Sequence, residues 1–480
     1  MISDIIILYF LGLTLLLLSD LLGLTLFRFR NINIFIGVLL GYLSIIALYA
    51  IIKGSFNSVG ILVVVWIVGY FFIIKKHTES PIIKKQIYFQ RLLIIGVLWS
   101  VIFALKVSYF WNIEYNSPNL LFVDYEFYMK VAEGYNLSGN ENVFGLENVL
   151  LPFLDFAQPY RSNDFWLVSL GLDITKIDTI YIWELFYSTI SISICSLSLF
   201  VLLKRKFNLI WSLVLSTLIL FAFAGHWYRD IINLFYAPNP GSYDPIGIIS
   251  YTKLSIIFSI IFHFFYKFEK GKKIEGLYFL ILIPLLAQPS IAIFLLLFLI
   301  IIGYILFDKG TLKNRIINYL PFIGISSFLI LGFLIFYLLN QQKEAFYIGS
   351  SNLNIYNNTS ILNFIIQFFK KAVLMFISYY WLSFLLATLL LFITKSLSKI
   401  LRIELFITLL LCYISCILVY AKFYNIGDSY QFLTNTFGPF VLALIIYLLI
   451  QTPISLTLGK IKLALIIIVY YGYERDYWGK

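Results

Sequence analysis

Apolar runs long enough to cross a bilayer recur along the whole of this 480-residue chain, with short polar segments between them. A helix of about 20 apolar residues spans roughly 30 Å of hydrocarbon. Only helices and closed barrels satisfy their backbone hydrogen bonds in lipid, so such runs predict membrane-spanning helices. The chain is 12% charged, whereas soluble domains carry about 25% charged residues. We therefore predict an all-α polytopic membrane protein whose surroundings are a lipid bilayer.

The apolar runs predict about fourteen transmembrane helices. They lie at 4–27, 32–52, 57–74, 92–110, 180–203, 207–225, 246–266, 275–287, 290–307, 316–339, 372–394, 403–421, 434–450 and 460–473. We divide the chain into an N-terminal three-span segment at 1–91, a core at 92–310 and C-terminal spans at 311–480.

Short clusters of Lys and Arg between these spans predict their orientation. All the clusters fall on one side of the membrane, which the positive-inside rule assigns to the cytoplasm. They lie at Lys75–Arg91, Lys204–Lys206, Lys267–Lys273, Lys309–Arg315 and Lys395–Arg402. The N-terminus then faces outward. Because the basic residues follow the loops in this way, the net charge of +11 does not indicate nucleic acid as a partner.

Counting spans from the same orientation places the longest loop, residues 111–179, on the outer face. It contains ten acidic residues against Lys130, Arg161 and Lys176. Loops of this length usually have a function or a structure of their own, and we expect short amphipathic helices in it. The bias toward Ile, Phe, Tyr, Asn and Lys is typical of an AT-rich bacterial gene. We therefore predict a multi-pass protein of the bacterial inner (plasma) membrane.

The segment DYEFYMKVAEG, residues 124–134, lies near the start of this loop. One interpretation is a short helix with Asp124 as its N-cap, a Glu126–Lys130 pair one turn apart, and Gly134 at its end. The other is catalytic. A carboxylate of Asp124 or Glu126 at the membrane surface can deprotonate a sugar hydroxyl, or hold Mg²⁺ or Mn²⁺ against a phosphate. The sequence does not identify a cofactor, and Asp124 is the expected ligand of any metal.

The segment PYRSNDFWLVSL, residues 159–170, closes the loop. Ser162, Asn163 or Asp164 is a candidate helix cap, with Phe165, Trp166 and Leu170 lying on the membrane surface. Alternatively, Arg161 and Asp164 face a cavity in which Arg161 binds a phosphate through two hydrogen bonds.

Two further polar positions lie at the predicted outer ends of spans. His226 and Arg229 in HWYRD are candidates for binding an anionic head group. Lys253 lies about two turns below the outer end of its span, where a charge costs a few kcal/mol unless it faces a cavity or a partner. It either extends its ammonium to the surface or binds a phosphate, with Glu184 as the nearest carboxylate by depth.

No stretch of the GxxxxGK[ST] or GxGxxG type is present, and the predicted cytoplasmic loops are too short for a nucleotide-binding domain. These observations argue against an ATP-driven pump. A transferase in this setting would need a donor that is reachable from the membrane or the outer face. We therefore expect a lipid-linked donor.

An acidic outer loop with DYEFY at its start and PYRSNDFWLVSL at its end, followed by many spans with short connections, resembles the GT-C superfamily of membrane glycosyltransferases. The resemblance covers roughly 92–310 and is nearest to the members of bacterial surface-polysaccharide loci. It implies a polyprenyl-phosphate sugar donor, a glycan or lipid acceptor on the outer face, and a catalytic acid in the first outer loop. On this basis Asp124 is the first candidate, Glu126 the second and Asp164 a later one.

Two alternatives remain open. An O-antigen or capsule polymerase or ligase also transfers glycosyl groups on the outer face, but its largest outer loop usually comes late in the chain, whereas here it comes early. A non-enzymatic transporter of lipid-linked saccharide would have repeated halves with broken helices at the midplane. The sequence shows no convincing internal repeat.

Overall fold

Helices form nearly all of the described chain, as the apolar runs predict. A computed structural model describes residues 2–27, 32–54, 58–73, 85–112, 117–118, 124–139, 141, 161–222, 254–287, 290–307, 311–339, 365–366, 368–370, 372–373, 380–422 and 435–452. The one extended pairing in these ranges joins β1 (Trp111–Asn112) to β2 (Ser117–Pro118). The prediction of an all-α protein is confirmed.

Five helical runs are long and apolar enough to cross a membrane. They belong to α1 (Ile2–Leu26), α2 (Ile34–Gly54), α4 (Lys85–Phe110), the continuous run of α8 (Thr179–Tyr181), η1 (Ile182–Tyr187) and α9 (Ser188–Leu203), and α19 (Lys399–Lys422). Shorter helices are α3 (Gly60–Ile73), α10 (Leu209–Ala222), α12 (Ser255–Glu269), α13 (Lys273–Leu286), α14 (Ala292–Phe307), α18 (Trp381–Ile393) and α21 (Phe437–Gln451). The long helix α15 (Leu312–Leu339) contains an apolar stretch at Tyr319–Ile335.

Each predicted span from 4–27 to 434–450 therefore contains a helix, and span 460–473 lies outside the described residues. Crossing of the bilayer by about fourteen helices remains a prediction.

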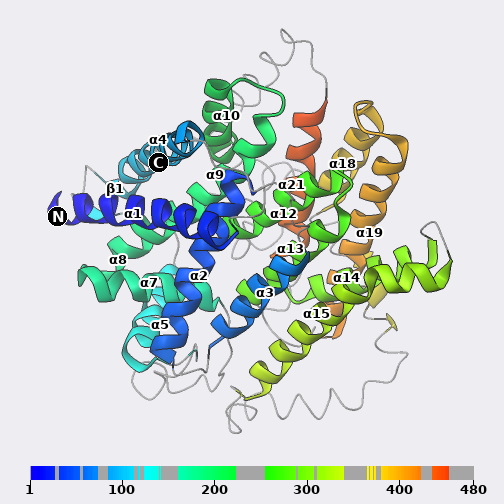
Figure 1. The fold of residues 1–480 in the computed structure, drawn as a ribbon, viewed down its shortest axis with the longest axis horizontal. Coiled ribbons are helices and arrows are strands. Elements are labelled where there is room, and N and C mark those ends of the chain that lie inside the picture. Colours follow the sequence, from blue (N-terminus) through cyan, green and yellow to red (C-terminus); the bar gives the residue numbers. More distant parts are fainter. Residues whose placement is uncertain are drawn as a thin grey trace.

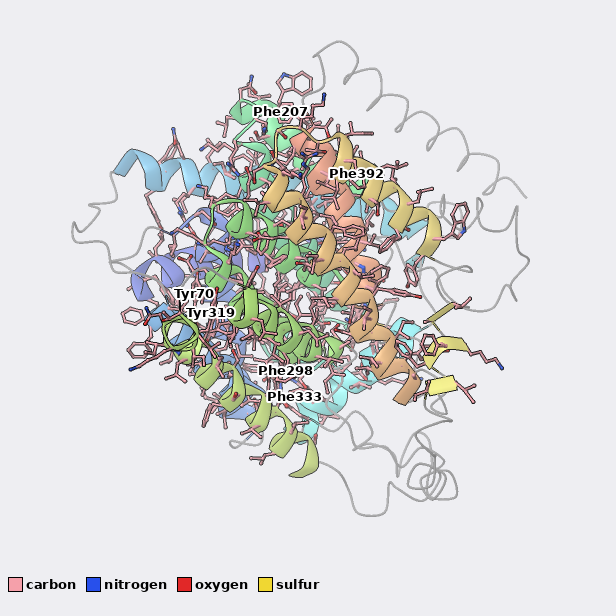
Figure 2. The ribbon with its side chains drawn as sticks, turned by 90° about the vertical axis from the view of Figure 1, so that its right-hand side faces the viewer. Tyr70, Phe207, Phe298, Tyr319, Phe333 and Phe392 are labelled. Carbon is pink, nitrogen blue, oxygen red and sulfur yellow. The ribbon has the colours of Figure 1, made fainter. Side chains whose placement is uncertain are left out.

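The surface of the bundle carries large apolar side chains, as expected of helices in a bilayer (Figure 2). Ile52, Phe392 and Phe298 are 81%, 71% and 60% exposed, whereas Tyr70 and Phe333 are buried in the bundle. Because so many exposed apolar side chains would be unfavourable in water, the structure supports a lipid environment.

The helices α1 and α2 approach each other most closely at glycines. Gly37 and Gly41 are spaced four residues apart on α2, the small-xxx-small pattern that brings membrane helices into backbone contact. A Cβ atom added to Gly41 would lie 1.8 Å from the carbonyl oxygen of Ser19, and one added to Gly23 would lie 2.0 Å from that of Gly37. The α1–α2 contact therefore requires glycine at these positions.

We expect Gly41→Ala to destabilise the protein by about 1–3 kcal/mol, because the new methyl group forces α1 away from α2. The matched control is Gly96→Ala in α4, where an added Cβ meets nothing within 4 Å. Thermal unfolding in detergent distinguishes them. Equal melting temperatures for the two variants would contradict a close approach of α1 to α2 at Gly41.

A buried ion pair joins α1 to α4. The sequence predicts that Asp20, deep in the first span, pairs within the bundle. Its partner is Arg91, whose Nε donates to Asp20 Oδ2 at 2.9 Å and whose Nη2 donates to Oδ1. The placement of Arg91 in a basic loop is therefore wrong, because Arg91 is a buried residue of α4. A fork-shaped guanidinium suits a carboxylate that must be satisfied away from water.

Three of the five basic clusters predicted to share one side lie at one end of the bundle. Arg205 Nη1 lies 2.7 Å from Glu269 Oε2, and Gln451 Nε2 donates to the same oxygen at 2.9 Å. Lys273 pairs with Glu404. These contacts tie the 204–206, 267–273 and 395–402 segments together. Assignment of this end to the cytoplasm remains a prediction.

The 111–179 loop, which is predicted to face outward, contains two helices, α5 (Asp124–Ser138) and α7 (Ser162–Thr175), which we call the outer helices. They lie side by side next to α2 (Figure 1). The predicted helix from Asp124 is confirmed, but its end at Gly134 is wrong. The helix continues to Ser138, and Gly139 follows with a φ of +66°. Glycine after the last helical residue adopts this left-handed conformation without strain.

Candidate functional site

The candidate site is the pair of outer-loop helices, α5 and α7, and the membrane helices under them. The ring of Tyr135 lies 5.3 Å from that of Phe165 and 5.1 Å from that of Trp166, and its hydroxyl lies 3.3 Å from Ser162 Oγ. Tyr128, two turns earlier, packs on Phe165 at 6.0 Å. The helix that begins at Asp124 therefore packs on the first turn of the helix that begins after Arg161.

Asp124 and Glu126 occupy the first turn of α5. Their side chains lie outside the description, so the predicted N-cap, the Glu126–Lys130 pair and the catalytic role are not tested. The backbone still limits where they are. Asp124 precedes Tyr128 by one turn, or about 6 Å along the helix axis, and Tyr128 is in contact with α7. The second turn of α5 therefore packs on α7 through Tyr128, and Asp124 lies one turn before this contact.

Arg161 and Asp164 come together at the start of α7. Arg161 Nη1 lies 3.9 Å from Asp164 Oδ2, and the Arg161 side chain is 1% exposed. Asn163, between them, donates to Tyr42 Oη of α2 at 2.9 Å. The first turn of α7 is thus a buried polar layer against α2. The opposite charges lie in surroundings where electrostatic interactions are stronger than in water.

Two expectations for this segment are wrong. Ser162, Asn163 and Asp164 do not cap α7, because they lie within its first turn, and the N-cap is Arg161 without a side-chain cap bond. Phe165 and Trp166 do not lie on the membrane surface. Both are almost fully buried against Tyr135, because the two outer helices share an aromatic core.

Glu141 is a buried residue that the sequence did not single out from the other acids of the loop. Its carboxylate accepts hydrogen bonds from the Val59 backbone N–H at 2.8 Å and from Trp166 Nε1 at 2.6 Å. Burial raises the pKa of Glu141 to about 7, although the hydrogen bonds it accepts oppose this rise. Glu141 therefore joins α7 to the turn between α2 and α3.

A second polar contact fixes the other end of α7. Asp173 accepts hydrogen bonds from Tyr49 and from Lys53 on α2, each at 2.7 Å, and from Asn136 on α5 at 2.7 Å. Burial acts to raise the pKa of Asp173, but the hydrogen bonds outweigh it and the pKa is lowered. The outer helices are thus attached to α2 at both ends of α7.

An ion pair lies beneath the outer helices, inside the bundle. Lys106 Nζ of α4 donates to Glu184 Oε2 of η1 at 2.8 Å, and their side chains are 1% and 0% exposed. The Glu184 Oε1 atom is buried and has no hydrogen-bond partner among the described residues. Trp183, next to Glu184, stacks on Tyr128 of α5 with 5.8 Å between ring centroids. The pair is therefore directly below the α5–α7 unit.

Glu184 was expected to be the carboxylate nearest Lys253, but the residue it pairs with is Lys106, which the sequence analysis missed. Lys106 lies inside the apolar run of the predicted span 92–110, one turn before its end, and this position was the available signal. The π-helical turn η1, which carries Glu184, is a local irregularity frequent at functional sites.

His226, Arg229 and Lys253 lie outside the described residues, so their predicted roles are untested. Within the described ranges no group of three His, Cys, Asp or Glu side chains is arranged to hold a metal. Asp164 is unsuited to that role, because the Arg161 guanidinium lies beside it. A magnesium or manganese ion at Asp124 remains a prediction.

Comparison of the chain with protein-family models, curated proteins and solved structures found no match. The resemblance to the GT-C superfamily therefore remains a prediction. The case for function rests on the residues and contacts described above.

Proposed function

We propose that this protein is a membrane glycosyltransferase that moves a sugar from a polyprenyl-phosphate donor to a glycan or lipid acceptor on the outer face. One observation carries the proposal. The helix that begins with Asp124 and Glu126 packs directly on the helix that begins beside Arg161 and Asp164. A carboxylate-bearing turn and a guanidinium-bearing turn thus share one unit next to the membrane helices.

In this reaction Asp124 is the base. Its carboxylate takes the proton of the acceptor hydroxyl, and the hydroxyl oxygen forms a bond to the anomeric carbon of the donor sugar. The bond between that carbon and the phosphate oxygen breaks, and its electron pair leaves with the polyprenyl phosphate. Glu126 is the second candidate for the base. Packing of α5 on α7 positions the backbone that carries both residues, and positioning is the main contribution such a scaffold makes.

The charge that develops on the leaving phosphate needs a positive neighbour. Arg161 lies at the N-terminus of α7, where the helix dipole also favours negative charge. Its burial reduces solvent screening, so the guanidinium acts on a nearby anion more strongly than a surface arginine would. Asp164, 3.9 Å away, orients the guanidinium in this proposal and does not take the proton.

The Lys106–Glu184 pair favours a second candidate, a transporter of lipid-linked saccharide. Buried ionisable groups inside a bundle frequently mark substrate or ion pathways, and Glu184 of this pair lies in a π-helical turn. The two functions differ in where the lipid-linked sugar collects when the protein is missing. Loss of a transferase leaves it in the outer leaflet, whereas loss of a transporter leaves it in the inner leaflet.

The experiment therefore compares cells with and without the gene for this chain. Surface glycan is measured by lectin binding, and the leaflet of the polyprenyl-phosphate sugar by its accessibility to impermeant periodate in spheroplasts. We expect less surface glycan and an accessible, accumulated donor in cells without the protein. Accumulation of inaccessible donor would indicate transport instead, and an unchanged glycan and donor pool would contradict both functions.

A further inference from the structure

We propose that Glu141 is a positioning residue that takes up a proton. The packing of α7, which carries Asp164 and follows Arg161, against α2 and the α2–α3 turn then depends on pH. The effect of Glu141 on activity rests on the proposed function, but its effect on the structure of the outer unit does not. Glu141 lies outside the helices, two residues after Gly139, and its side chain is nevertheless fully buried.

The position of Glu141 is fixed by the backbone before it. Gly139 has a φ of +66°, and a Cβ added there would lie 2.5 Å from the Lys53 carbonyl oxygen. The chain leaving α5 therefore turns tightly against the end of α2 and delivers Glu141 into the α2–α3 turn. An ordinary side chain at residue 139 would prevent this approach.

One carboxyl group then joins three parts of the fold. The Val59 N–H belongs to the α2–α3 turn, and Trp166 Nε1 belongs to the second turn of α7. The hydroxyls of Ser58 and Ser162 lie near the carboxylate and act to lower the pKa of Glu141. Loss of this group would leave a buried indole N–H and a buried backbone N–H unsatisfied, which proteins rarely tolerate.

This set of partners accommodates both protonation states. Two partners, the Val59 N–H and the Trp166 indole, only donate. The two serine hydroxyls donate or accept according to their rotation. When Glu141 is ionised it accepts from the Val59 N–H and the Trp166 indole, and when it is protonated a nearby serine hydroxyl can turn and accept its hydrogen. Protonation therefore removes a buried charge without breaking the network.

The surroundings of Glu141 contain few other charges. On α7, Arg161 and Asp164 are paired with each other, and the pKa of Glu141 is shifted by burial and hydrogen bonds. From α5 the neighbour is the buried Tyr135 hydroxyl, whose pKa burial raises well above its usual value and the Glu141 charge raises further. At the end of α2, Lys53 is paired with Asp173. Burial therefore determines the direction in which the pKa of Glu141 shifts.

The pH dependence follows from the raised pKa of Glu141, about 7 against an ordinary value of 4.5. Below the ordinary value the group is protonated in folded and unfolded protein alike. Between the two values only the folded protein binds the proton, so stability falls as pH rises. Above the pKa of Glu141 in the folded protein, the carboxylate is charged in both states and its burial destabilises the folded protein by the full amount. The difference corresponds to a change of about 300-fold in the unfolding equilibrium of the outer unit.

The test is the fluorescence of Trp166 in the full-length protein, measured from about pH 5 to about pH 9. The signal of Trp166 is obtained by subtracting the fluorescence of the Trp166→Phe variant from that of wild type. We expect a transition with a midpoint of about 7 in wild type. Glu141→Gln, which keeps the shape of the protonated acid, should show no transition. Asp173→Asn is the matched control and should keep it, because Asp173 holds the other end of α7 and its pKa is lowered.

The same transition in Glu141→Gln, or none in wild type, would overturn the inference. A measurement on wild type alone covers the case in which the variants fail to insert. Its thermal midpoint should fall as pH rises from about 4.5 to about 7 and level off above that, and a flat profile between those two values would contradict the proposal. A fluorescence transition without any glycosyl transfer would leave Glu141 as a proton site and refute only the proposed function.

Discussion

Replacement of Asp124 by Asn should lower glycosyl transfer by about 10²–10⁴-fold, the usual contribution of a general base. The amide has nearly the same shape as the carboxylate but cannot take the proton of the acceptor hydroxyl. Asp124 begins α5, and the next turns of that helix lie on α7, so the loss should appear in kcat with little change in donor binding. The measurement is sugar transfer by membranes that contain equal amounts of inserted protein.

Two controls make this result specific. Glu126→Gln tests the second carboxylate of the same turn and should have the smaller effect. Asp173→Asn removes an acid of the same outer unit whose contacts with Tyr49, Lys53 and Asn136 give it a structural role, and it should retain transfer. Full activity in both Asp124→Asn and Glu126→Gln would show that the base lies elsewhere.

The largest effect on stability is expected at the buried pair below the outer helices. Lys106→Met leaves the Glu184 carboxylate without its cation at a site that is 0% exposed, and breaking a buried pair in this way costs about 3–5 kcal/mol. The double variant Lys106→Met/Glu184→Gln removes both charges, and most of the lost stability should return.

The free energy of unfolding in mixed detergent micelles measures how much this pair stabilises the protein, and Lys53→Met is the matched control. Lys53 also contacts a carboxylate, but its side chain is 31% exposed, so its loss should cost about 1 kcal/mol or less. A double variant as unstable as Lys106→Met alone would contradict the account, because the defect would then not be the unpaired charge.

The sequence predicted the helical class and the position of most helices, because apolar runs and membrane thickness determine them locally. It also predicted that the loop after residue 110 has structure of its own, and that Asp124 begins a helix. These features depend on neighbours in the chain. The contact between α5 and α7 is different, since it joins Tyr135 to Phe165 across residues with no recognisable pattern.

The partners of buried charges were the least predictable part. Asp20 meets Arg91, Glu184 meets Lys106, and Glu141 meets Trp166, at separations of 71, 78 and 25 residues. Depth in a span limits the choice of partner but does not decide it, because rotation of each helix about its axis decides which side chains meet. Glu184 illustrates this. Lys253, a candidate partner by depth, lies outside the described residues, whereas the packing of η1 against α4 brings Lys106 to Glu184.

The central claim is that this chain transfers sugar at the outer face. Purified protein in liposomes, given a radiolabelled polyprenyl-phosphate sugar in the leaflet that contacts α5 and α7 and an acceptor on that side, tests it most directly. The account predicts labelled acceptor and unlabelled polyprenyl phosphate on the same side, both abolished by Asp124→Asn. Labelled donor that crosses the bilayer with its sugar still attached, and no labelled acceptor, would contradict it.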